Sequence, residues 1–170
     1  YIDAEVVYDD NVSDEMQNFK NEEMKFEQFS RDAINIKNNV NISANLRDFT
    51  SVLETSMLNR RLYPLQLLAS YHLAFSQNGC NFSVPGAGKT SIVYGAYAYL
   101  KNQTLNPLKT VDKILIIGPL SAFAPWELEY KECFGIDPDV KRINGSLNVE
   151  QKKQYFYGDT SEITLVSYAS

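Results

Sequence analysis

From residue 61 onward, short runs of apolar residues alternate with longer amphipathic stretches. Such runs predict β-strands at residues 79–84, 113–118 and 162–168, and a further short strand is predicted at residues 140–143. The run KILIIG, residues 113–118, has four apolar residues in succession, as a parallel strand covered on both faces requires. Helices are predicted at residues 64–77, 89–103, 121–135 and 148–158. This order predicts a parallel α/β sheet with flanking helices, built from right-handed crossovers.

The earlier part of the chain has a helical pattern instead. Residues 1–15 are acidic and lack apolar periodicity, which predicts an extended lead-in. An amphipathic helix is predicted over residues 14–38, with its apolar positions at Met16, Phe19, Met24, Phe26, Phe29, Ala33 and Ile36. A second helix is predicted over residues 42–59, with one face formed by Leu46, Phe49, Leu53 and Met57. We expect this N-terminal helical segment, residues 1–58, to dock on, or to bridge to, the α/β lobe at residues 59–170.

Composition and charge narrow the class of protein. The 170 residues are 44% hydrophobic and 22% charged, an ordinary globular composition. No run of about 18 apolar residues occurs and the N-terminus is acidic, so we expect an intracellular, cytoplasmic protein without a membrane contact. Residues 1–60 contain 12 acidic and 6 basic residues, whereas residues 61–170 contain 9 and 10. The acidity therefore belongs to the front segment and argues neither for nor against a nucleic-acid contact in the rest.

The cysteines and the histidine do not have the spacing of metal ligands or of a disulfide framework. Cys80 and Cys133 are 53 positions apart, which indicates neither a zinc site nor a disulfide framework and favours two buried thiols. His72 has no acidic or cysteine neighbour at ligand spacing, so we expect it to be a structural helix residue.

The stretch NFSVPGAGKT, residues 81–90, is typical of a phosphate-binding loop. Such a loop needs glycines that accept unusual dihedrals, followed by a helix whose N-terminus carries a partial positive charge. Lys89 then reaches the β and γ phosphates, and the Thr90 hydroxyl binds magnesium. We therefore expect a nucleoside triphosphate and Mg²⁺ as cofactors, with Lys89 and Thr90 as the catalytic residues. The predicted ligands of the nucleotide within this loop and the start of the helix are Pro85, Gly86, Ala87, Gly88, Lys89, Thr90 and Ser91.

Four blocks resemble, in order, the motifs of superfamily 2 helicases, in particular Swi/Snf-type DNA translocases. They are LYPLQ (62–66), SVPGAGKT (83–90), ILIIGPLSAFAPWELEY (114–130), and the strands VKRINGS (140–146) and EITLVSYAS (162–170). Ser83 stands where the usual loop pattern begins with glycine, and helicase-type motors often carry Ala or Ser there. The resemblance implies a P-loop NTPase fold, with residues 59–170 as a partial RecA-like ATP-binding lobe.

The resemblance also implies roles for single residues. Gln66 would read the adenine edge, for which its amide has both a donor and an acceptor; the alternative is an exposed helix residue. The predicted contacts to a DNA backbone, with duplex DNA as the partner, are Pro119, Ser121, Ser167 and Tyr168. A helix cap is the alternative for Ser121. Trp126 is expected to pack in the core or between subdomains, with stacking on a base as the alternative. The basic residues Lys141, Arg142, Lys152 and Lys153 are either solvated surface or a phosphate track.

Hydrolysis in the resembled family needs carboxylates and an arginine beyond the motifs found here. The carboxylates stand on a strand after the block at 162–170, and the arginine belongs to a second RecA-like lobe. We therefore expect this chain to be the N-terminal piece of a DNA-dependent ATPase that binds nucleotide weakly and hydrolyses essentially none. Two alternatives stay open. One is a nucleotide kinase, although after the loop only Arg142 is an arginine. The other is a module that binds a protein partner through its N-terminal helices.

Overall fold

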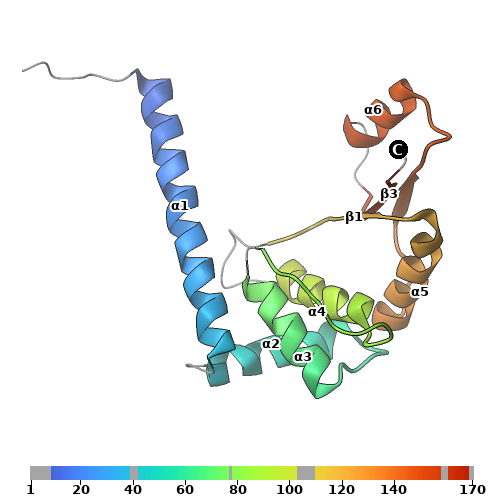
Figure 1. Ribbon diagram of the computed structural model, residues 1–170, viewed down its shortest axis with the longest axis horizontal. Coiled ribbons are helices and arrows are strands. Elements are labelled where there is room, and N and C mark those ends of the chain that lie inside the picture. The colour runs from blue at the N-terminus through green and yellow to red at the C-terminus, as the bar shows by residue number, and fades with distance from the viewer. Residues whose placement is uncertain (1–8, 39–41, 77, 103–109, 158–160, 169–170) are drawn as a thin grey trace, which may run out of the picture.

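The computed structural model describes residues 9–38, 42–76, 78–102, 110–157 and 161–168, which form a mixed α/β fold (Figure 1). Its helices are α1 (Asp10–Lys37), α2 (Ile42–Ser56), α3 (Pro64–Phe75), α4 (Lys89–Lys101), α5 (Phe123–Phe134) and α6 (Val149–Tyr157), with a short 3-10 helix, η2 (Leu120–Ala122). Its strands are β1 (Ile114–Gly118), β2 (Val140–Ile143) and β3 (Ile163–Ser167). The predicted helices from residue 42 onward are confirmed to within a few residues at each end.

The strands form a parallel sheet with the order β1-β3-β2. Ile114 and Val140 both align with Ile163, so the strands start at a common edge. At β1 one face of the sheet is left uncovered, because Leu115 and Ile117 are 55% and 59% exposed. The prediction that residues 113–118 are covered on both faces is therefore wrong.

The strand predicted at residues 79–84 is not formed. This segment makes no strand pairing, and Phe82 and Val84 are 92% and 71% exposed. A strand requires a neighbour for its backbone N–H and C=O groups, and within the described residues β1, β2 and β3 pair only with one another. The prediction is wrong because an apolar run does not reveal whether such a neighbour exists.

The core forms around α4, whose tyrosines meet aromatic rings from three other helices. Tyr94 lies edge-on to Trp126 and Tyr130 of α5, with ring centroids 5.4 and 5.5 Å apart. On another side, Phe49 of α2 contacts Tyr99, at 5.0 Å, and Tyr71 of α3, at 5.4 Å. Such ring pairs stabilise by about 0.5–1.5 kcal/mol beyond the area they bury. The predicted packing role of Trp126 is confirmed.

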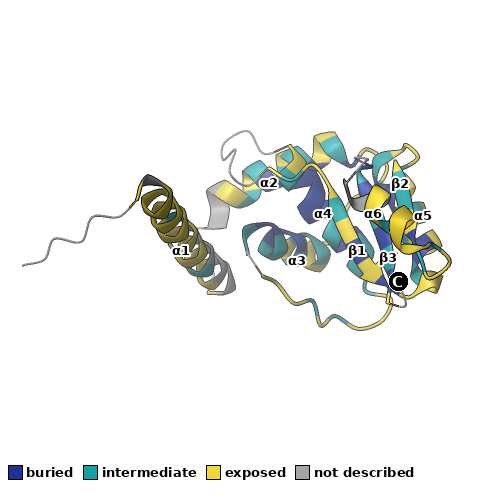
Figure 2. Cartoon of the chain, turned by 90° about the horizontal axis from the view of Figure 1, so that it is seen from above, coloured by how far each residue is buried: buried dark blue, intermediate teal, exposed yellow. Residues whose placement is uncertain are grey.

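Helices α1 and α2 differ in how they meet this core. The predicted face of α2 is confirmed, since Phe49, Leu53 and Met57 are buried and Leu46 is partly buried. Helix α1 begins before the predicted residue 14; residues 1–8 of the predicted lead-in lie outside the described residues. It contacts α3, but most of its length projects from the body and is exposed (Figures 1 and 2). Helix α2 therefore docks on the body, and α1 meets it where it contacts α3. The domain boundary at residue 58 stays a prediction.

The cysteines are both free and differ in burial. Cys133 is buried, as predicted, whereas Cys80 is exposed, so the prediction of two buried thiols is wrong for Cys80. Cys80 lies in the segment at 79–84 that did not join the sheet.

His72 is in α3, where the Ser76 hydroxyl approaches its ring. No helix among the described residues has the length and apolarity needed to cross a bilayer.

Helices α3 and α4 approach closely at Gly95. A Cβ added there would lie 2.8 Å from Leu62 Cδ1 and would also clash with Ser70 Oγ. Overpacking of this kind typically costs about 1–3 kcal/mol, more than the gain of about 1 kcal/mol from replacing glycine in a helix. We therefore expect Gly95→Ala to lower the free energy of unfolding, measured by urea denaturation. Gly118→Ala is the control, because its added Cβ would meet an ordinary contact at 3.9 Å, from Ala122. Equal stability of the two variants would contradict this packing.

Candidate phosphate-binding loop

The glycine loop has the backbone conformation that its sequence predicts. Gly86 and Gly88 have φ angles of 82° and 78°, in the left-handed region that side chains other than glycine rarely adopt. The N–H of Ala87 donates to the carbonyl of Val84 at 3.2 Å and closes a turn. Gly88 then caps the N-terminus of α4. A turn with such glycines points successive N–H groups into one concave space, which is how backbone binds an anion.

Lys89 and Thr90 are the first two residues of α4. The first N–H groups of a helix lack intrahelical acceptors, and the helix dipole makes this end partly positive. The Lys89 ammonium donates to the Val84 carbonyl at 3.0 Å, so the lysine side chain reaches back over its own loop. Both side chains therefore start from the helix end that favours anions.

Gln66 of α3 is in contact with the loop. Its Nε2 donates to the Ala87 carbonyl at 2.9 Å, and its Oε1 accepts from the Tyr63 N–H at 3.0 Å. The second bond belongs to the N-terminal cap of α3, where Pro64 at the first position needs no acceptor. The structure thus brings Gln66 to the glycine loop across 21 positions of sequence.

The Ser91 hydroxyl is turned away from the loop, into the fold. It is 1% exposed and donates to the Glu129 carboxylate of α5, which also forms an ion pair with Arg60 at 3.3 Å. Because its hydroxyl points into the fold, Ser91 could reach a nucleotide only through its backbone.

The Glu129 carboxylate also lies close to Cys133. Burial, with the nearby Glu129 charge, raises the pKa of the Cys133 thiol to about 12. Glu129 and Arg60 were not singled out from the sequence, which carries no local signal for this contact.

The four predicted nucleic-acid residues come together at the carboxyl ends of β1 and β3. Gly118 pairs with Ser167, so Pro119 and Tyr168 directly follow two aligned positions. Ser121, in η2, is exposed, and Tyr168 is 75% exposed, whereas Ser167 is buried. In Figure 1 the strands lie above α4, whereas the segment that leads into this helix runs across it and enters it at its lower right end. The predicted site residues therefore form two separate groups.

The basic cluster is partly neutralised by carboxylates. Arg142 binds Glu127 through two hydrogen bonds of 2.6 Å, and Lys153 lies 3.5 Å from Glu150. The paired hydrogen bonds, with the Glu127 charge, raise the pKa of Arg142. This pairing favours the solvated-surface interpretation over a continuous phosphate track.

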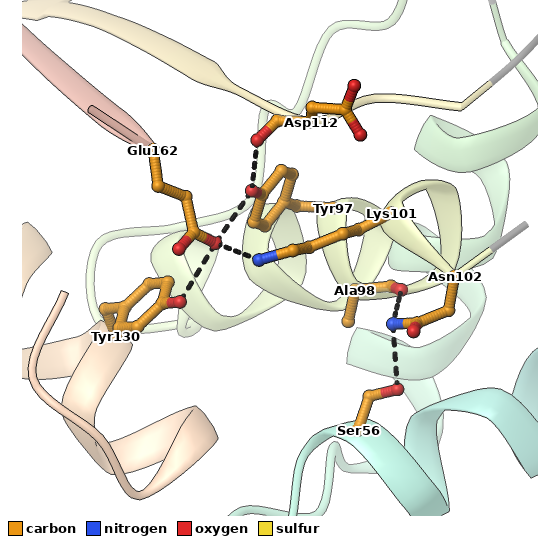
Figure 3. Close-up of polar contacts among 8 residues, drawn as sticks. All are labelled: Ser56, Tyr97, Ala98, Lys101, Asn102, Asp112, Tyr130 and Glu162. Carbon is orange, nitrogen blue, oxygen red and sulfur yellow. Dashed lines mark hydrogen bonds and ion pairs between the residues drawn. The ribbon is translucent and has the colours of Figure 1, made fainter. Parts of the chain in front are cut away.

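A polar cluster lies at the opposite ends of the strands and joins β3 to α4 and α5 (Figure 3). Its centre is Glu162, whose Oε1 accepts from Lys101 Nζ at 2.6 Å, from Tyr97 at 2.8 Å and from Tyr130 at 2.9 Å. Burial works to raise the pKa of Glu162, but the hydrogen bonds from Lys101 and the tyrosines outweigh it, so the pKa is lowered. With three donors on one oxygen, Glu162 acts as a structural link between these elements.

Comparisons with known proteins bring no further assignment. A scan against protein-family models finds no match to this chain, and neither does a search of curated proteins. The resemblance to helicases thus depends on the ordered motifs in the sequence.

Proposed function

We propose that the chain binds a nucleoside triphosphate with Mg²⁺ at residues 85–90 and serves as the RecA-like, P-loop ATP-binding lobe of a superfamily 2-type DNA translocase. One observation carries the proposal: two glycines with positive φ lead directly into α4, whose first residues are Lys89 and Thr90. The backbone amides and the helix N-terminus suit phosphate oxygens. Lys89 would exchange its Val84 carbonyl for a phosphate, and the Thr90 hydroxyl suits magnesium.

The test is isothermal titration of the chain with a non-hydrolysable ATP analogue and MgCl₂. We expect a saturable signal with one site per chain, weakened when magnesium is removed. No heat at millimolar analogue would reject nucleotide binding and favour a partner-binding module. A second titration with AMP addresses the kinase alternative, because a site built for the β and γ phosphates gains little from a monophosphate.

The DNA contact of the proposed motor is supported by the group at the carboxyl ends of β1 and β3. Ser121 and Tyr168 are exposed there, and hydroxyl groups are common partners of backbone phosphates. We expect Ser121→Ala combined with Tyr168→Phe to weaken binding of a labelled duplex by about 5-fold to 150-fold, since two neutral hydrogen bonds are lost and each contributes about 0.5–1.5 kcal/mol. Fluorescence anisotropy at low salt measures this. Ser13→Ala in α1 is the control, and equal affinity of the double variant and the control would refute the contact.

A partner-binding role is favoured separately by α1. Val12, Met16 and Phe19 are 42%, 41% and 72% exposed on this helix, and acidic residues lie between them. Apolar side chains left in water on a projecting helix are typical of interaction surfaces. This role is compatible with nucleotide binding, because α1 carries no residue of the glycine loop.

A further inference from the structure

We infer that Gln66 supports the shape of the glycine loop and does not read the base, so that the site selects the triphosphate and accepts any nucleobase. This inference rests on the proposed nucleotide binding and specifies its substrate class. The observation behind it is that the Gln66 amide is held at both ends, by the Tyr63 N–H and by the Ala87 carbonyl.

The bond to Ala87 controls an amide of the loop. A peptide unit is planar and trans, so the carbonyl of Ala87 and the N–H of Gly88 point in opposite directions. Gln66 Nε2 holds that carbonyl at 2.9 Å and thereby fixes the direction of the Gly88 N–H. This N–H lies at the N-terminus of α4, where an anion is favoured. Gln66 therefore positions a phosphate-binding group without touching the phosphate itself.

The space beside Gly88 is filled by the same amide. A Cβ added to Gly88 would clash with Gln66 Nε2, and the φ of 78° at Gly88 already disfavours a side chain there. The glutamine and the glycine thus fit each other closely. The conformation of the glycine loop therefore depends on Gln66, a residue of α3 that lies outside the loop.

Base reading would have to disrupt this arrangement. A glutamine distinguishes adenine by presenting its oxygen and nitrogen together to the base edge. Turning the amide toward a base would break the bonds to Tyr63 and Ala87, each worth about 0.5–1.5 kcal/mol, in order to make two of similar strength. The exchange leaves little net preference for adenine. The exposed ring of Tyr63, 73% accessible beside Gln66, can stack on a base, and stacking tolerates every base.

The experiment compares three ligands with Mg²⁺ on the wild-type chain: ATP, GTP and inorganic tripolyphosphate. We expect the ATP and GTP affinities to agree within about 3-fold by isothermal titration, because the loop recognises the shared triphosphate. A preference for ATP over GTP of tenfold or more would overturn the inference. Failure of all three ligands to bind would reject the proposed nucleotide site itself, and the inference with it.

Two variants test the positioning role. Gln66→Met keeps the size but removes both hydrogen bonds, and Gln66→Glu places a carboxylate oxygen against the Ala87 carbonyl. Both are expected to weaken ATP, GTP and tripolyphosphate alike, by about tenfold, which corresponds to about 1.4 kcal/mol. Gln17→Met on α1 is the matched control, with unchanged affinities. Loss confined to ATP would identify a base reader and overturn the inference; the wild-type comparison decides the question if a variant does not fold.

Discussion

The Lys89→Ala variant is expected to bind an ATP analogue at least about tenfold more weakly than the wild-type chain. A hydrogen bond to a charged group contributes about 1.5–3 kcal/mol, and 1.4 kcal/mol corresponds to a factor of ten. The Lys89 ammonium is at the N-terminus of α4 and can leave the Val84 carbonyl for a phosphate. Isothermal titration with MgCl₂ measures the change, which should be largest for the triphosphate and smallest for AMP.

Thermal unfolding and a charge control distinguish a loss of nucleotide binding from a loss of folding. Lys89 has one hydrogen bond, to the Val84 carbonyl, and lies at the surface, so its loss should shift the midpoint of thermal unfolding little. Lys20→Ala removes one positive charge from exposed α1 and controls for the general effect of charge on an anionic ligand. If Lys89→Ala and Lys20→Ala bind the analogue equally well, the glycine loop is not the nucleotide site.

The secondary structure was largely predictable, because most of it is encoded by local patterns. The face of α2 containing Phe49 and Leu53 has helical spacing and is buried. Strands β1 and β3 were found from their apolar runs, and β2 from its place between two predicted helices. The run at residues 79–84 has the same local appearance but no pairing partner in this structure. Pairing is a property of the assembled sheet, so local pattern could not decide it.

The candidate site was predictable only where it depends on local conformation. Positive φ angles were expected at Gly86 and Gly88 because a phosphate-binding turn requires glycine there. The bond from Gln66 to Ala87 depends on the packing of α3 against α4, which the sequence does not encode locally. For Ser91 a signal existed: it lies three and seven positions before Tyr94 and Ala98, on the buried face of α4. That periodicity would have placed its hydroxyl in the core.

The Glu162→Gln variant is expected to lose about 1–2 kcal/mol of stability at neutral pH, measured by urea denaturation. Glutamine keeps the shape but makes only neutral hydrogen bonds, and about half the strength of the charge-assisted bonds is lost. Lys101 would then lack its carboxylate partner. Because Glu162 joins β3 to α4 and α5, the loss should appear in the midpoint of one cooperative transition with an unchanged denaturant dependence.

The pH dependence of this difference distinguishes the charge from the shape of Glu162. The pKa of Glu162 is lowered in the folded protein, so its contribution is fully present above the ordinary glutamate value of about 4.3. As the pH falls through the folded pKa, both states become protonated and the contribution disappears. The stability gap between wild type and Glu162→Gln should therefore narrow below about pH 4. Glu150→Gln, which removes an exposed carboxylate beside Lys153, should show little gap at any pH. A gap for Glu162→Gln that stays constant down to pH 3 would mean that packing, and not the ionised carboxylate, holds the start of β3 in place.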